Sequence, residues 1–267
     1  MLLSWKIFKK SVLIVLDNLK EAFRVSGAIF VAAVFASSAL NVFLTGDLTI
    51  GAPDIQAVKD TNGQDQLVAL NFSSQKITAL MGGNLIFFIA MSWIAIAWHR
   101  FILIEESTNY IFPIWDNSRI IKYSIKTIAI VTSVIFILII PFSMINIFIN
   151  SLGLVLILPA VNILLFISFF YYLFFRAGLV LPSIALDKTM SIKQSFFETK
   201  TMSKEIWGLA VIVIVMILGI GVISGILAPN NIIGVLVTSL FQWIVVMVSA
   251  SLMTTLYGHI IERRPIL

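Results

Sequence analysis

The sequence contains no cysteine and only two histidines, His99 and His259. The absence of cysteine excludes disulfide bonds and thiolate metal sites. Two histidines are too few for a histidine-based metal centre. Charged residues are also scarce, at 12% of the chain, about half their share in an ordinary soluble domain. We therefore predict no metal site, no cofactor and no ordinary soluble fold.

Long apolar runs take the place of charge. Apolar residues make up 60% of the 267 residues, and the mean hydropathy is +1.04. A membrane-spanning helix needs roughly 20 predominantly apolar residues, so the chain is long enough for several. The runs predict one all-α domain, a polytopic membrane helix bundle over residues 1–267. Its six expected spans are residues 25–44, 81–104, 123–145, 154–175, 205–227 and 232–258.

Residues 4–24, ahead of the first span, have the pattern of an amphipathic helix. Such a helix is expected to lie in the membrane interface, with its lysines toward anionic headgroups. It is either a lipid-sensing or partner-binding helix or, in the interpretation we favour, a lead-in helix packed on the bundle. The predicted apolar stripe contains Trp5, Phe8, Val12, Leu16, Leu19 and Phe23.

A second amphipathic helix is predicted at residues 187–204, ahead of the fifth span. Ser191 and Gln194 have the spacing of a capping box, so a helix should begin there. The six spans group into three hairpins with charged lead-in segments, and residues 45–80 form the one sizeable loop, on the side opposite the termini. Within this loop we expect a short strand or helix at Gln66–Leu70.

Lysine and arginine are distributed very unevenly between the two sides of the predicted bundle. Sixteen of the eighteen lie in residues 1–24, 100–126 and 176–204 or in the C-terminal tail, and only Lys59 and Lys76 lie on the other side. Because cytoplasmic loops are enriched in lysine and arginine, this asymmetry predicts that both termini are cytoplasmic. The net charge of +5 then follows from topology, and no nucleic-acid partner is expected.

Polar chemistry is concentrated where the second span ends, at His99 and Arg100, with Glu105 and Glu106 close behind. One interpretation is a clamp for a phosphate or lipid headgroup, or a general base at His99. The interpretation we favour is an interface anchor from which Arg100 extends to water. No nucleophile, glycine-rich phosphate loop or metal-ligand spacing accompanies these residues, so we predict that the protein is not an enzyme.

Arg176 and Asp187 flank the apolar stretch 179–185 after the fourth span. This stretch could line a cytoplasmic entrance. We favour a structural role, in which Arg176 pairs with Asp187 or binds lipid phosphate and so fixes the turn into the Ser191 helix. Pro182 is expected to break the emerging helix.

Asn162 and Gln242 are the two amide side chains closest to the middle of the membrane. Each lies nine or ten residues from the far end of its span. At 1.5 Å per residue, both are roughly 14–15 Å deep. The matching depth predicts a hydrogen bond between their helices, worth about 0.6–2 kcal/mol.

Two further features concern how the spans pack. Gly221 and Gly225 have the spacing of a close helix contact, either within the chain or across a dimer. Pro141 and Pro159 lie inside the third and fourth predicted spans and are expected to kink them.

The pattern over residues 176–207 resembles the membrane domain attached to some bacterial glycerophosphodiester phosphodiesterases, and related stand-alone inner-membrane proteins of unknown function. That resemblance implies a bacterial inner-membrane bundle. The soluble phosphodiesterase domain and its carboxylate–histidine metal set have no counterpart in this sequence, so no reaction carries over. The residues that match are Arg176, Pro182, Ser191, Ser195 and Trp207, together with Trp98, His99 and Arg100.

The function expected from the sequence is therefore that of a non-enzymatic inner-membrane protein. It would act in envelope or lipid-related work or as an accessory subunit, in contact with membrane lipids, other membrane proteins or a second copy of itself. The alternative is a transporter or permease-like component with a cytoplasmic entrance near Arg100, Arg176 and Asp187. A continuous polar cavity that reaches Asn162 and Gln242 would favour transport.

Overall fold

The computed structural model describes residues 2–46, 54–59, 65–71, 74–106, 112–152, 158–228 and 232–266. Within these residues, six helical segments are long and apolar enough to cross a membrane. The protein is thus a multi-pass membrane helix bundle, and the predicted fold class is confirmed. The segments are Leu19–Thr45, Ser74–Ile104, Asn117–Ile149, Leu158–Ala185, Lys200–Leu227 and Ile233–Ile260.

The elements follow one another in the order that the apolar runs predict. The helices are α1 Leu3–Asp17, α2 Leu19–Thr45, α3 Ser74–Ile104, α4 Asn117–Ser151, α5 Leu158–Ala177, α6 Val180–Ala185, α7 Ile192–Glu198, the 3-10 helix η1 Lys200–Met202, α8 Ser203–Leu227 and α9 Ile232–Ile260. The strands are β1 Asp54–Lys59 and β2 Asp65–Asn71.

The helices extend beyond the predicted spans, because helical turns continue past the apolar runs into polar sequence. Five predicted spans lie entirely inside observed helices, and the first residues of the fourth, 154–157, fall outside the described residues. Since α2 continues to Thr45 and α3 begins at Ser74, the predicted loop 45–80 is shortened at its far end. Inside it, β1 and β2 form an antiparallel hairpin, and Gln66–Leu70 belongs to the strand β2.

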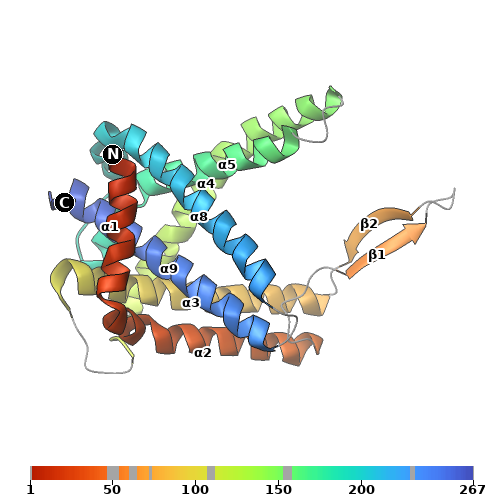
Figure 1. Cartoon of the computed structure of the whole chain (residues 1–267), viewed down its shortest axis with the longest axis horizontal. Helices are drawn as coiled ribbons and strands as arrows, with labels where there is room; N and C mark the ends of the chain where they lie inside the picture. Colours follow the sequence, from red (N-terminus) through yellow and green to blue (C-terminus); the bar gives the residue numbers. More distant parts are fainter. Residues whose placement is uncertain are drawn as a thin grey trace.

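Both chain termini lie at one end of the bundle, and the β1–β2 hairpin lies at the other (Figure 1). The pairs α2–α3 and α4–α5 pack as hairpins. In the third predicted hairpin, α8 and α9 contact each other less than they contact other helices. Helix α8 packs mainly on α5 and α1, and α9 packs mainly on α1 and α3. The end that carries the termini is called the charged end below.

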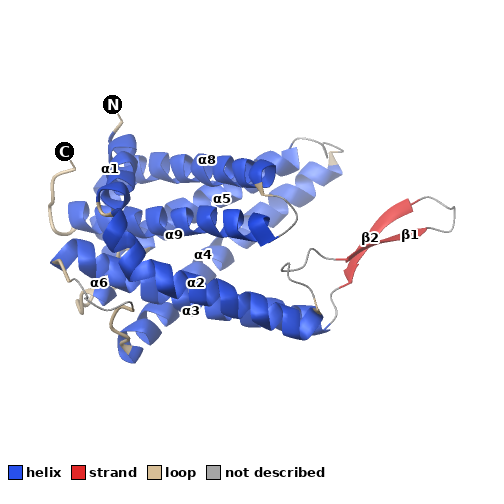
Figure 2. Cartoon of the chain, turned by 60° about the horizontal axis from the view of Figure 1, so that its bottom comes forward, coloured by secondary structure: helices blue, strands red, loops and turns tan. Residues whose placement is uncertain are grey.

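Helix α1 lies across the charged end rather than along the bundle (Figures 1 and 2). It packs on α8 and α9, as the lead-in interpretation expected. The predicted helix 4–24 is interrupted at Asn18, and residues 19–24 belong to α2. The face that packs on the bundle is small and partly polar, and it consists of Ser4, Ile7, Ser11 and Val15.

The predicted apolar stripe of this first segment coincides with the packed face only in part, since Phe8 and Val12 are partly buried against the core and the other four residues are exposed. Trp5 is 42% exposed and Leu16 is 53% exposed, so both point away from the bundle. In a membrane, close helix contacts favour small residues, because lipid solvates large apolar side chains as well as a neighbouring helix does. Ser11 illustrates this, since its Oγ lies within hydrogen-bond distance of the Ile7 carbonyl, at 2.8 Å, and of Thr255 Oγ1 in α9, at 2.9 Å.

Helix α6 is the buried centre of the charged end. Its residues from Val180 to Ser183 are buried, and it packs against α3, α4 and α9. The prediction that Pro182 breaks the helix is wrong, because the break comes earlier, between α5 and α6 at Gly178 and Leu179. Pro182 lies in the first turn of α6, where a missing backbone N–H costs nothing.

Candidate functional site

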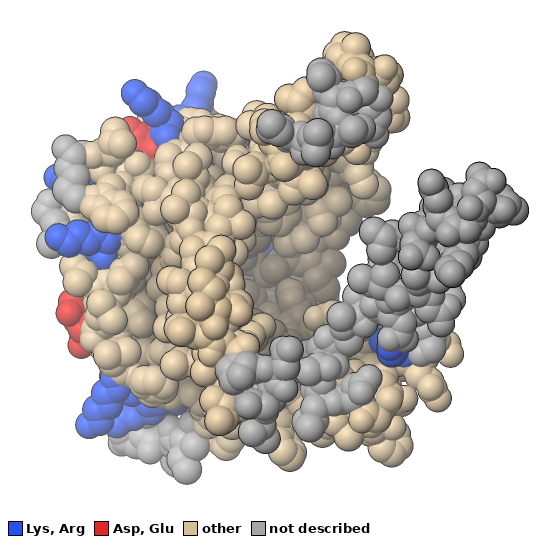
Figure 3. Space-filling view, turned by 45° about the vertical axis from the view of Figure 1, so that its right-hand side comes forward, with Lys and Arg blue, Asp and Glu red and all other residues tan. Residues whose placement is uncertain are grey.

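The charged end holds the predicted site residues His99, Arg100, Arg176 and Asp187. Figure 3 shows that most of the basic side chains visible in that view lie along one edge. His99 is the most buried of them, with none of its surface exposed. Its Nδ1 lies 2.8 Å from Thr254 Oγ1, and its Nε2 lies 3.2 Å from the Tyr123 hydroxyl. The Thr254 hydroxyl itself donates to the Ala250 carbonyl at 2.8 Å. These bonds fit a ring that donates from Nδ1 and accepts at Nε2.

The position of His99 therefore suits packing better than catalysis. Both ring nitrogens are engaged, and the ring joins α3 to α4 and α9. A general base needs to reach the proton that it removes. The imidazole lies beneath the charged end and offers no free nitrogen there.

Arg100 is the centre of an ionic network at the surface of the charged end. Its Nε donates to both carboxylate oxygens of Glu106 at 2.9 Å. Its Nη1 donates to the Ala185 carbonyl at 2.8 Å and to Asp187 Oδ2 at 3.2 Å. Arg119, at the start of α4, donates from Nη2 to Asp187 Oδ2 at 2.9 Å. The arginine network consists of Arg100, Glu106, Asp116, Arg119 and Asp187.

The network changes the ionisation of its carboxylates. Hydrogen bonding from Arg119, and then the charges of Arg119 and Arg100, hold the pKa of Asp187 below its ordinary value. Hydrogen bonding from Arg100 likewise lowers the pKa of Glu106. Asp187 has a φ of +57°, in the left-handed region that asparagine and aspartate adopt more readily than most residues. The network thus stabilises both the charge and the unusual backbone of the segment after α6.

The predicted ion pair between Arg176 and Asp187 is wrong. Asp187 pairs with Arg100 and Arg119 instead. Arg176 turns to the other side, where it donates to the Phe196 carbonyl at 2.7 Å and to Thr199 Oγ1 at 3.3 Å. Arg176 and Asp187 lie at the two ends of the buried stretch 179–185. The sequence does not reveal the direction in which each end of this stretch faces, and that direction decides the partner of each residue.

Arg176 still fixes the entry into the Ser191 helix, although through different bonds. Ser195 of α7 donates from Oγ to the Arg176 carbonyl at 2.6 Å, and the guanidinium bonds described above hold the same helix. Helix α7 begins at the predicted cap, because the Ser191 hydroxyl accepts the Gln194 backbone N–H at 3.1 Å. The predicted continuous helix over 187–204 is wrong, since α7 ends at Glu198 and is followed by η1 and α8. The structural interpretation of Arg176 therefore holds, with α7 in place of Asp187.

The predicted bond between Asn162 and Gln242 is not formed. Asn162 donates from Nδ2 to the Phe142 carbonyl of α4 at 3.2 Å, and Gln242 is exposed on α9. The two residues were matched by depth alone. Helix α5 packs on α4 and α8, so a depth match with α9 brings no contact.

The predicted close contact at Gly221 and Gly225 is not made within the chain. A Cβ built on either glycine would meet no atom of the described residues within 4 Å. The close packing occurs between α2 and α3, where the Ser37 hydroxyl donates to the Gly83 carbonyl at 3.2 Å. Pro159 is the second residue of α5, where it is tolerated, and Pro141 lies inside α4.

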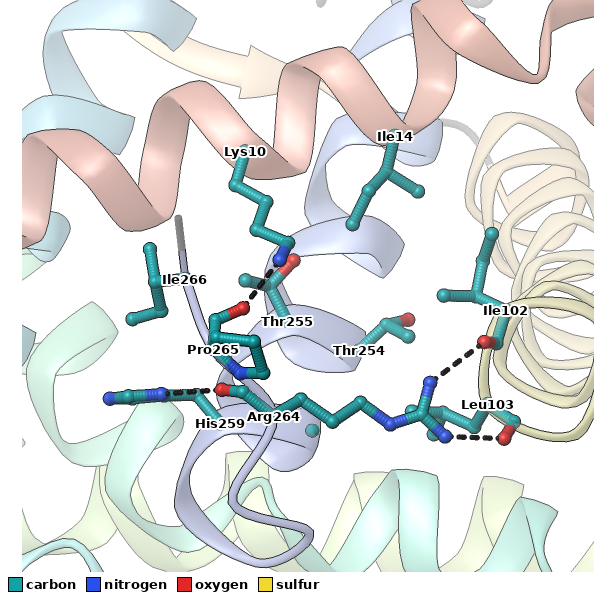
Figure 4. A pocket seen from close by; sticks show the side chains of 11 residues that line it. Lys10, Ile14, Ile102, Leu103, Thr254, Thr255, His259, Arg264, Pro265 and Ile266 are labelled. Atoms are coloured by element: carbon teal, nitrogen blue, oxygen red, sulfur yellow. Dashed lines mark hydrogen bonds between the residues drawn. The ribbon is translucent and has the colours of Figure 1, made fainter.

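A cavity of about 140 Å³, which the sequence pattern did not predict, lies at the charged end between α1, α3, α9 and the C-terminal tail (Figure 4). Arg264 in the tail donates to two carbonyls in the last turn of α3, at 3.2 and 2.6 Å. Lys10 of α1 donates to the Pro265 carbonyl at 2.6 Å. His259 Nδ1 lies 2.9 Å from the Arg264 carbonyl. The clustered basic residues of the tail were visible in the sequence, but the carbonyls that they contact were not.

The described residues contain no group of three or more histidine, aspartate or glutamate side chains placed to hold a metal ion. No protein-family model, curated protein or solved structure matches this chain. Function is therefore argued from the geometry of the charged end.

Proposed function

We propose that this protein is a non-enzymatic component of a bacterial inner membrane, and that it acts in envelope or lipid-related work or as an accessory subunit. The observation that carries the proposal is that the candidate side chains of the charged end, His99, Arg100 and Arg176, are bonded to other groups of the protein. His99, the arginine network and Arg176 each join helices, and none of them offers a free catalytic group. The resemblance of residues 176–207 to the phosphodiesterase membrane domains supports the same location.

We also propose that the charged end faces the cytoplasm. The two termini lie together at that end (Figure 1), where most lysines and arginines of the sequence are placed. Positively charged segments are retained on the cytoplasmic side during insertion. The β1–β2 hairpin at the opposite end would then face away from the cytoplasm.

The orientation can be tested directly, because the natural chain has no cysteine. Lys9→Cys lies on the charged end, and Gln75→Cys lies at the far end of α3, and both side chains are exposed. A maleimide that cannot cross the membrane should label Gln75→Cys in intact spheroplasts and Lys9→Cys only after lysis. The reverse labelling pattern would overturn the proposed orientation.

The non-enzymatic role can be tested separately. Purification in native membrane particles, followed by protein and lipid mass spectrometry, should recover a membrane-protein partner or a retained lipid. The purified protein should leave common glycerophospholipids chemically unchanged. Headgroup cleavage or transfer that disappears in a folded His99→Ala variant would refute the proposal.

A further inference from the structure

Arg176 carries a positive charge that nothing acidic neutralises in the part of the chain that the structure describes. Its three hydrogen bonds go to the neutral acceptors Thr199 Oγ1, the Tyr172 hydroxyl and the Phe196 carbonyl. The contrast with Arg100 and Arg119 is clear, because both of those guanidiniums contact carboxylates. A partly buried charge costs free energy unless an opposite charge approaches it.

The guanidinium is also held rigidly. Its carbon lies 4.9 Å from the ring centre of Phe196 and 5.7 Å from that of Tyr172. An arginine offers five N–H donors, and three are used here. One donor on each terminal nitrogen therefore remains, and a pair of this kind suits two oxygens of a phosphate.

The surroundings add positive charge and an exposed apolar side chain. Lys193, Lys200 and Lys204 are exposed on α7, η1 and the start of α8, and none is paired with a carboxylate among the described residues. Phe197, on the outer side of α7, is 73% exposed. The acidic residues of these elements, Glu198 and Glu205, are outnumbered by the lysines and also make no ion pair there.

The apolar side chains identify the class of anion. Phe197 would be buried where headgroups meet acyl chains, and free phosphate would leave it in water. Trp207 packs edge-on against Tyr172 and Phe169, with ring centres 5.2 and 4.7 Å away, and tryptophan favours the membrane interface. We infer that Arg176, Lys200 and Lys204 bind the phosphate of an anionic phospholipid. This inference goes beyond the proposed function, which requires no particular lipid and no particular site.

The test compares lipid binding by the full chain in nanodiscs of phosphatidylcholine with and without phosphatidylglycerol. Native mass spectrometry should show retained phosphatidylglycerol and no retained phosphatidylcholine. The double variant Lys200→Ala/Lys204→Ala should weaken binding by about fivefold per lysine, because one basic residue near an anionic surface contributes about 1 kcal/mol. Arg176→Lys should weaken it further, since lysine keeps the charge and loses the paired donors.

The matched control is Lys9→Ala/Lys122→Ala, which removes the same charge from two other exposed positions at the charged end. It should retain phosphatidylglycerol like the natural chain. Equal losses in the two double variants would show non-specific attraction and overturn the inference. Retention of phosphatidylcholine, or full displacement of phosphatidylglycerol by inorganic phosphate, would also overturn it. Thermal unfolding of each variant verifies that the protein remains folded, and the lysine pair tests the site even if Arg176→Lys unfolds.

Discussion

The imidazole of His99 and the guanidinium of Arg176 both attracted functional interpretations from sequence, and their surroundings separate them. His99 has two neutral partners and no exposed surface, so its bonds hold helices together. Arg176 uses three of its five donors on neutral acceptors and keeps one donor on each terminal nitrogen unused. At the scale of single residues, unused hydrogen-bonding capacity distinguishes a candidate binding group from a packing group.

Replacement of His99 by alanine is expected to destabilise the bundle by about 1–3 kcal/mol, because the buried Tyr123 hydroxyl would lose its partner. The measurement is thermal unfolding in detergent. Tyr123→Phe removes only the hydroxyl and should cause a smaller loss. An unchanged unfolding temperature for His99→Ala would contradict the packing role.

Acid should weaken the arginine network. The pKa of Asp187 is lowered in the folded protein, so its stabilising effect is complete above the ordinary value of 3.8 and is lost as pH falls below it. The unfolding temperature of the natural chain should therefore fall at acidic pH. Asp187→Asn should unfold at lower temperature near neutral pH and show a smaller further fall in acid. Parallel pH profiles for the two proteins would disprove this assignment.

At the scale of elements, the glycines show which helix contacts are close. A Cβ on Gly178 would lie 2.7 Å from the Phe174 carbonyl oxygen and would also strike Met253, at the break between α5 and α6. A Cβ on Gly221 would meet nothing within 4 Å in the part of the chain that the structure describes. The break that positions α6 therefore depends on a glycine that the sequence motif did not include.

Gly178→Ala is expected to destabilise the protein by about 1–3 kcal/mol through overpacking. Gly221→Ala, the matched control inside α8, should be neutral or slightly stabilising, since alanine favours helix more than glycine does. Unfolding curves of the two variants give the comparison. Equal stability of both would mean that the α5–α6 junction is not tightly packed.

At the scale of the whole molecule, the C-terminal tail connects the two ends of the chain. Arg264 donates to a carbonyl at the end of α3, Lys10 of α1 donates to the Pro265 carbonyl, and the Ile266 side chain is buried. Lys188 also pairs with Glu262 of the tail at 3.1 Å. The tail thus joins α1, α3 and α9 with the segment after α6, and closes one side of the cavity.

Arg264→Ala should remove the hydrogen bonds between the tail and α3 and lower the free energy of unfolding by about 1–3 kcal/mol, because carbonyls at the end of α3 lose charged donors. The neighbouring Arg263→Ala is the control, since Arg263 is exposed and makes no bond among the described residues. Limited proteolysis of the tail and thermal unfolding should both distinguish the two variants. Equal sensitivity of the two variants to protease and to heat would show that Arg264 does not hold the tail on α3.

The number and the approximate bounds of the spans could be predicted from the sequence. Apolar runs and clusters of lysine and arginine are local properties, and the membrane acts on each of them separately. The Ser191 cap was predictable for the same reason, because its partner Gln194 is three residues away. The long-range partners of Arg176, Asp187 and Asn162 were not, because they depend on how each helix is rotated and which helix lies beside it.

The first amphipathic segment shows the same division between local properties, which the sequence determines, and long-range contacts, which it does not. Its sequence alone determined that residues near the N-terminus form a helix with apolar and basic sides. Only the tertiary structure decided which side packs: Ser4 and Ser11 face the bundle, and Trp5 faces outward. Lipid solvates apolar side chains on the outside of a membrane bundle, so hydrophobicity places a helix in or on the membrane, whereas close contacts between helices select its partners.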